Sequence, residues 1–127
     1  MSKLPARKEP VRHTNEELTS LCQMLGLTSE RDVDQTAARV FRIVLTDGKG
    51  GVKSVEVAQK GNLNRITAIH HLKRLESQGV LQKKENKYFF AFNDLEDFID
   101  EYERKERERF HRIKKLVTEL EKELTFE

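Results

Sequence analysis

The stretch VAQKGNLNRITAIHHLKRLESQGVLQKKENKYFFAF, residues 57–92, decides the fold. It contains two helical patterns joined by the turn sequence GNL, and Asn64, a helix-capping residue type, stands directly before the second pattern. Gly79 ends that pattern, and the segments VLQKK and YFFAF then flank a turn at ENK, which is typical of a β-hairpin. The order of helix, tight turn, helix and hairpin predicts a helix-turn-helix with a wing.

The same stretch resembles the recognition unit of winged helix-turn-helix transcription regulators of the MarR and ArsR kind. A small residue, a turn glycine, a T-x-x-x-H-L-x-x-L run and a final glycine–apolar pair recur in those families; here they are Ala58, Gly61, Thr67 with His71, Leu72 and Leu75, and Gly79 with Val80. The resemblance implies a sequence-specific DNA-binding regulator, with helix 64–78 in the major groove and wing 80–92 on the DNA backbone. Ile69 stands where a small polar residue is common, and the wing tip is short, so we expect the helix to supply most base contacts.

Residues 27–92 are expected to form this DNA-binding domain. Upstream of the quoted stretch, Ser29 is the expected cap of a helix that stops at the loop 47–51, a flexible turn. Val52 and Lys53 suffice for one short strand pairing, and Ser54 is the expected cap of a helix over 55–60 that Gly61 ends. The helix after Ser29 is expected to bury Val33, Ala37, Val40, Phe41, Val44 and Leu45 and to turn Arg31, Asp34, Arg39 and Arg42 outward.

The two ends of the chain differ from this domain. Residues 1–13 hold both prolines and four basic residues and are expected to be a disordered basic arm. Residues 14–26 predict a short helix opened by a capping box of Thr14 and Glu17 and closed by Gly26. Residues 93–127 contain neither glycine nor proline and predict one long helix. The predicted fold class is thus mainly α with a small β-wing and a long C-terminal helix.

Apolar stripes outside the winged helix predict a homodimer. The C-terminal helix carries seven consecutive charged residues, 103–109, expected to be a solvated spacer, and beyond them apolar residues repeat at coiled-coil spacing. A lone helix with an apolar seam must bury that seam against something. We expect a second copy of the chain, and the alternative is that the helix folds back on its own domain. The expected dimer-contact residues are Leu18, Leu21, Leu25, Phe110, Ile113, Val117, Leu120 and Leu124.

Charge segregates along the chain although its total is only +2. Residues 31–92 carry twelve basic and six acidic residues, whereas residues 93–127 carry eight and twelve. A concentrated basic segment on a helix-turn-helix favours double-stranded DNA as the partner. The expected DNA-binding residues are Asn64, Arg65, Thr67, His70, His71, Lys73, Arg74, Lys83, Lys84 and Lys87.

The sequence shows no pattern typical of an enzyme. It offers no nucleophile–base pair, no cofactor motif and no metal-ligand spacing, because neighbouring His70 and His71 point about 100° apart on a helix. The lone Cys22 is expected to be buried on an apolar helix face, and no apolar run is long enough to cross a membrane, so a cytoplasmic protein is expected. Two alternatives to a specific regulator stay open: a winged-helix protein-interaction module of a larger complex, and a nonspecific chromatin or nucleoid protein.

Overall fold

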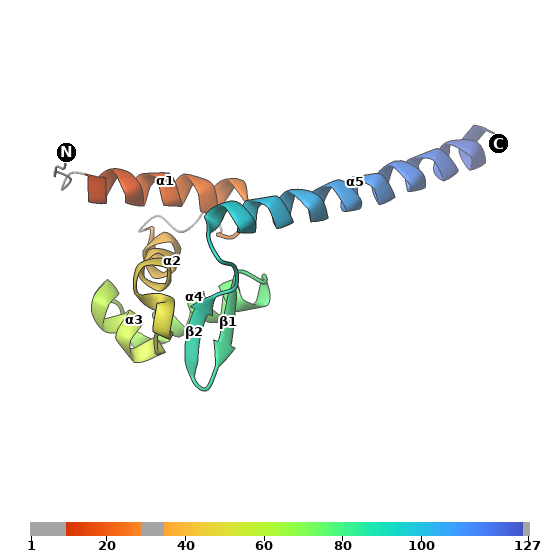
Figure 1. Ribbon diagram of the computed structural model, residues 1–127. Coiled ribbons are helices and arrows are strands. Elements are labelled where there is room, and N and C mark those ends of the chain that lie inside the picture. The colour runs from red at the N-terminus through yellow and green to blue at the C-terminus, as the bar shows by residue number, and fades with distance from the viewer. Residues whose placement is uncertain (1–9, 29–34, 126–127) are drawn as a thin grey trace. The chain divides into compact units, whose positions relative to one another are not determined.

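The computed structural model describes residues 10–28 and 35–125 of the chain, and the chain divides after Ala91 into two compact units (Figure 1). Among these described residues, the N-terminal unit holds four α-helices, a short 3-10 helix and a hairpin, and the C-terminal unit holds one helix. In chain order the elements are α1 (Pro10–Met24), α2 (Thr36–Asp47), η1 (Gly48–Gly50), α3 (Ser54–Gly61), α4 (Arg65–Ser77), β1 (Leu81–Lys84), β2 (Lys87–Phe90) and α5 (Leu95–Thr125). The predicted fold class is confirmed.

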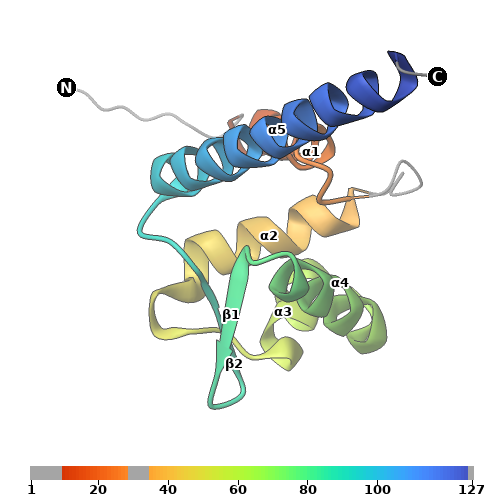
Figure 2. The same cartoon turned by 90° about the vertical axis from the view of Figure 1, so that its right-hand side faces the viewer.

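The core of the N-terminal unit is built around α2. In both views α1 lies on one side of α2, and α3, α4 and the hairpin lie on the other (Figure 2). Val40 and Phe41 are completely buried, and the ring of Phe41 lies 5.9 Å from that of Phe90 on β2. Of the predicted stripe, Ala37 and Val44 are also buried and Leu45 is half-buried.

Three helix ends in this unit close in the same way. After each of α1, α3 and α4, one residue adopts the left-handed conformation, and the backbone N–H of the following residue donates a hydrogen bond to a carbonyl in the last turn of the helix. These bonds run from Leu27 to the Cys22 carbonyl at 2.8 Å, from Leu63 to Ala58 at 2.8 Å and from Val80 to Leu75 at 3.0 Å. Gly26 and Gly79 take the left-handed positions after α1 and α4, as predicted.

The turn between α3 and α4 differs from the prediction. Asn62, not Gly61, is left-handed, and Gly61 is the last residue of α3. Gly61 allows close packing, because a Cβ there would lie 3.1 Å from Leu63 Cδ1 and 3.2 Å from Ile43 Cδ1 on α2, and these side chains would have to shift to make room. Arg39 on α2 donates a hydrogen bond of 2.9 Å from Nη1 to the Gly61 carbonyl, so this arginine holds the turn and does not point outward. Arg42 is also half-buried.

Three helix starts also differ from the prediction. α1 begins at Pro10 rather than Thr14, since proline is favoured in the first helical turn, so residues 10–13 of the expected arm are helical. α3 includes Ser54, and the Lys53 N–H donates to Glu56 Oε1 at 2.8 Å. α2 begins at Thr36 after Gln35, which has a φ of 57°. Four residues of the predicted upstream helix lie outside the described residues: the expected cap Ser29, the expected buried Val33, and the expected outer residues Arg31 and Asp34.

The wing is a two-stranded antiparallel hairpin, and one residue pair from elsewhere extends it. Leu81 pairs with Phe90 and Lys84 with Lys87, and the two-residue turn has positive φ at both Glu85 and Asn86, which is the geometry of a type I′ turn. Val52 bridges to Tyr88 through two backbone hydrogen bonds, of 3.0 and 2.8 Å. The predicted strand pairing after the loop 47–51 is therefore confirmed, and part of that loop forms η1.

The C-terminal unit is the 31-residue helix α5 and the residues just before it, about 46 Å of helix at 1.5 Å per residue. The Asp94 carboxylate accepts the Asp97 N–H at 2.8 Å and caps the helix. Near its start, the Phe98 ring lies 5.3 Å from Phe92 and 6.3 Å from Tyr102.

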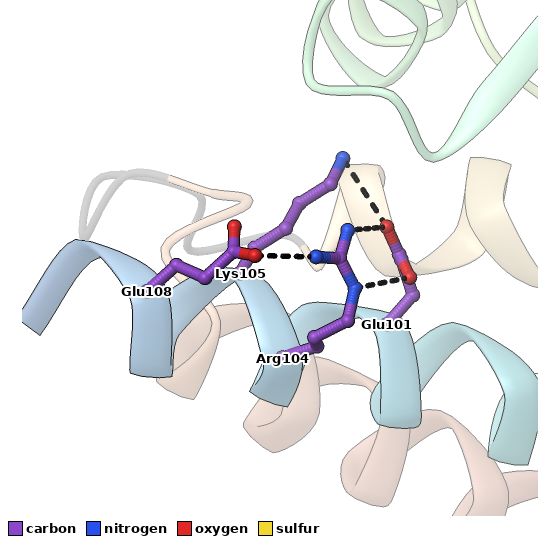
Figure 3. A network of polar contacts seen from close by, with 4 residues as sticks. All are labelled: Glu101, Arg104, Lys105 and Glu108. Atoms are coloured by element: carbon purple, nitrogen blue, oxygen red, sulfur yellow. Dashed lines mark hydrogen bonds and ion pairs between the residues drawn. The ribbon is translucent and has the colours of Figure 1, made fainter. Parts of the chain in front are cut away.

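Ion pairs within one helix face support the charged stretch of α5. Arg104 donates to Glu101 at 2.7 and 3.1 Å and to Glu108 at 2.8 Å (Figure 3). The hydrogen bonds from Arg104 hold the pKa of the Glu101 carboxyl below its usual value. Every residue from 103 to 109 is exposed, so these local pairs stabilise the helix where no apolar side chain packs.

Candidate nucleic-acid interface

Two local features fix the position of α4. Its inner face buries Ala68, Leu72 and Leu75 completely or nearly so, which fixes the rotation of the helix about its axis. At its start, Asn64 Oδ1 accepts the Ile66 N–H at 2.7 Å, so the predicted cap is confirmed. The exposed side of α4 is therefore a defined surface that the core and the cap orient together.

The exposed side of α4 agrees with the sequence prediction only in part. Four exposed residues at helical spacing, Ile66, His70, Lys73 and Ser77, form its centre line, and Arg65 is exposed beside them at the first turn. Thr67, His71 and Arg74 are half-buried on the flank, so these three expected DNA-binding residues are less accessible than the centre line, and their contact with DNA stays a prediction. The rings of His70 and His71 meet edge to face at 5.2 Å.

Ile66 is the surface residue that the sequence reading missed. Its side chain is 77% exposed, the highest value among the large apolar side chains of the winged helix itself. Selecting residues by polar or charged type, as is usual for contacts with DNA, does not identify an isoleucine. Helical spacing in the sequence could identify Ile66, because it lies four residues before His70 and therefore shares the same face of the helix.

The three wing lysines lie on two different faces of the hairpin. Lys84 and Lys87 are direct cross-strand partners at the tip. Lys83 pairs with Tyr88, on the other face by strand alternation, and its Nζ lies 5.5 Å from the centre of the Tyr88 ring. Like charges directly opposite each other destabilise a hairpin, so a bound anion at the tip would relieve this repulsion.

The electrostatics of this surface are strongly positive. Between residues 60 and 92 there are seven basic and two acidic residues. Lys60, at the end of α3, forms an ion pair with Asp47 at 3.1 Å, so this cation is already partly neutralised within the fold. Within the described parts of the chain, no ion pair joins a carboxylate to Lys73, Lys84 or Lys87. These three cations are therefore available to a polyanion.

Clusters of metal-ligating side chains and long apolar helices are both absent from the described residues. No group of three His, Cys, Asp or Glu side chains lies close enough together there to hold a metal ion. None of the helices in this part of the chain has the length and apolar content that crossing a membrane requires.

The expected dimer-contact residues fall into two classes. On α1, Leu18 is buried and Leu21 and Leu25 are half-buried, so this helix offers little free apolar surface at these positions. On α5 the whole stripe is exposed, from 37% to 69%: Phe110, Ile113, Val117, Leu120 and Leu124. The α5 stripe is thus an exposed apolar surface, as an interface requires, and both the α5 and the α1 contacts stay predictions.

Comparison with known proteins adds a likeness of fold. No family model matches the sequence, and no curated protein matches it. One solved structure with a similar fold is TrmBL2, described as an archaeal chromatin protein that shows a novel mode of DNA binding. The TM-score is 0.53 at 22% identity, and the match covers 84% of this chain and 40% of the TrmBL2 chain. At this identity the likeness concerns the fold alone, and this chain spans less than half of TrmBL2.

Proposed function

We propose that this chain binds double-stranded DNA with α4 in the major groove and the hairpin tip on the phosphate backbone. The observation that carries the proposal is the Lys84–Lys87 pair, two like charges held opposite each other at an exposed hairpin tip. Such a pair costs folding free energy unless an anion is present. The winged-helix fold and its likeness to a chromatin protein that binds DNA support the same partner.

The dimensions and chemistry of α4 suit the major groove. A helix is about 10–12 Å across with its side chains, and the groove is about 12 Å wide. In helix-turn-helix proteins the N-terminal residues of the second helix contact base edges. Arg65 is exposed there and offers the paired N–H donors that match the O6 and N7 acceptors of guanine.

The finer function proposed is that of a sequence-specific transcription regulator similar to MarR and ArsR proteins, acting at the nucleoid in the cytoplasm. The fold likeness to TrmBL2 favours a second candidate, a nonspecific chromatin protein. Selection of bound duplexes from a random pool separates the two. A regulator yields a consensus, which is palindromic if the protein is a dimer, and a chromatin protein yields none.

We propose in addition that the α5 stripe pairs with a second copy of the chain. Its five residues are spaced alternately by three and four, the spacing of a coiled-coil seam, and each is more than a third exposed. Two copies joined in this way would present two α4 helices to half-sites about 34 Å apart. The alternative occupant is another protein, in which case the chain is an interaction module of a larger complex.

The DNA proposal is tested by the salt dependence of binding. The variant Lys84→Gln/Lys87→Gln should bind every duplex more weakly, and the slope of log K against log salt should become shallower by about 0.9 for each lost phosphate contact. The matched control is Lys115→Gln/Lys122→Gln, which removes the same charge from exposed positions on the outer face of α5. Equal slopes for both variants and the wild type would show that the hairpin tip does not touch phosphates.

The dimer proposal is tested by sedimentation. Ile113→Glu/Leu120→Glu places charge in the seam and should give monomers that bind DNA with lower affinity. Leu116 is 61% exposed but lies one position outside the seam, so Leu116→Glu should leave the association state unchanged. A double variant that still sediments as a dimer refutes the α5 seam, and a wild type that is monomeric supports a different partner.

A further inference from the structure

Ile66 combines three properties that bear on its function. It is 77% exposed, it lies on the centre line of the outer face of α4, and it belongs to the first turn of that helix. Its exposed neighbours are polar or cationic, with Arg65 before it and His70 and Lys73 further along the same face. An apolar group on a face that also carries the cations Arg65 and Lys73 is complementary to a partner that presents an apolar group among anions.

The major groove of DNA offers one apolar group of that kind. Each thymine places its 5-methyl group in the groove, between two rows of phosphates. A protein partner would instead require a continuous apolar patch, and the side chains that share the centre line with Ile66 are His70, Lys73 and Ser77. Resting on the DNA-binding function proposed above, we propose that Ile66 contacts thymine methyl groups and makes the chain prefer methyl-bearing bases.

The local structure prepares Ile66 for such a contact. Its backbone N–H is bound to Asn64 Oδ1 at 2.7 Å, so the residue is held at the start of the helix. A β-branched side chain on a helix has one strongly preferred χ1 rotamer. The side chain therefore loses little conformational freedom on binding, and its apolar end is already directed to the outside.

The test compares duplexes that differ only by methyl groups. An A·T-rich duplex is prepared with thymine and with uracil in its place, and a G·C duplex is prepared with cytosine and with 5-methylcytosine, which carries a methyl group at the same groove position. The wild type should bind the methyl-bearing member of each pair more tightly, by roughly fourfold for each methyl contacted. Fluorescence anisotropy at fixed salt measures both affinities, because the charges within each pair are identical.

Substitution of Ile66 completes the design. Ile66→Ser should bind both members of a pair equally, and Ile66→Leu should retain the preference because it keeps an apolar end. Met24→Ser is the matched control, since Met24 is an equally exposed apolar residue, at 81%, on α1. Circular dichroism confirms that each variant is folded, as expected for substitutions of exposed side chains.

The outcomes separate this inference from the function on which it rests. Tight, salt-dependent binding with no difference between methylated and unmethylated duplexes overturns the role of Ile66 and leaves DNA binding intact. A preference that persists in Ile66→Ser likewise assigns it to another residue and overturns the inference. If none of the duplexes binds, the proposed function itself fails, and this inference fails with it.

Discussion

Replacing Gly51 with alanine should destabilise the fold where the backbone meets the wing. Gly51 has φ 85° and ψ 152°, a region that essentially only glycine occupies, and an added side chain there costs about 1–3 kcal/mol of backbone strain. The new Cβ would also lie 2.6 Å from Phe89 Cζ and 2.8 Å from Lys87 Cβ. Relieving such crowding typically costs about 1–3 kcal/mol more, so the free energy of unfolding should fall by about 2–6 kcal/mol.

The neighbouring glycine provides the control for Gly51→Ala. Gly50 has no atom within 4 Å of where its Cβ would be, and its φ is not positive, so Gly50→Ala should leave stability unchanged or raise it by less than about 1 kcal/mol. Urea denaturation followed by circular dichroism measures both variants against the wild type. Equal midpoints for the two alanine variants would refute the argument that β2 approaches the backbone at Gly51 as closely as the structure places it.

Three further outcomes follow from hydrogen bonds and burial in single elements. Asn64→Ala removes the cap of α4 and should lower the free energy of unfolding by about 1 kcal/mol in urea, with faster hydrogen exchange confined to the first turn of that helix. Arg104→Gln should let the Glu101 pKa rise toward its usual value in a carbon-detected NMR titration, and an unchanged pKa would mean that the ion pair does not form in solution. Burial, and to a smaller extent Glu76, raises the pKa of Tyr88 above its usual value of 10.0. The stability that the neutral Tyr88 side chain contributes is therefore complete below pH 10.0 and is lost as the pH rises through the pKa of Tyr88 in the folded state. Tyr88→Phe should therefore show a shallower loss of stability above pH 10.0 than the wild type.

Much of the winged helix could be predicted because its signals are local. The cap at Asn64, the stop at Gly79 and the two-residue turn of the hairpin each depend on residue types within a few positions. The buried faces of α2 and α4 follow from the 3.6-residue period of apolar side chains. These features need no knowledge of what lies on the other side of the core.

The errors arose where tertiary contacts decide. The sequence predicts that Gly61 ends a helix because glycine has a free backbone. In the structure Gly61 lies inside α3, where a side chain would crowd Ile43 on α2. Arg39 was expected in solvent because it is charged, but it holds the carbonyl of Gly61 across the core boundary. Neither contact leaves a periodic pattern in the sequence, since each joins residues about twenty positions apart.

Assignment by residue type also misplaced part of the candidate DNA surface. All three wing lysines were grouped together, although strand alternation puts Lys83 on the face opposite Lys84. On α4, choosing polar types favoured His71 and passed over Ile66, whereas the rotation set by the buried face decides which residues reach outward. Phase along an element therefore predicts which side chains are exposed better than chemical type does.

Because Cys22 is completely buried, the reactivity of its thiol reports on the opening of α1. Because it is the only cysteine in the chain, any reaction with a thiol reagent reports on this one place. The reagent has no access until the helix separates from α2, so the rate of labelling measures how often that separation occurs under native conditions. The opening can thus be followed without introducing a cysteine by mutation. A ligand that stabilised the N-terminal unit would slow the labelling of a residue that it does not contact.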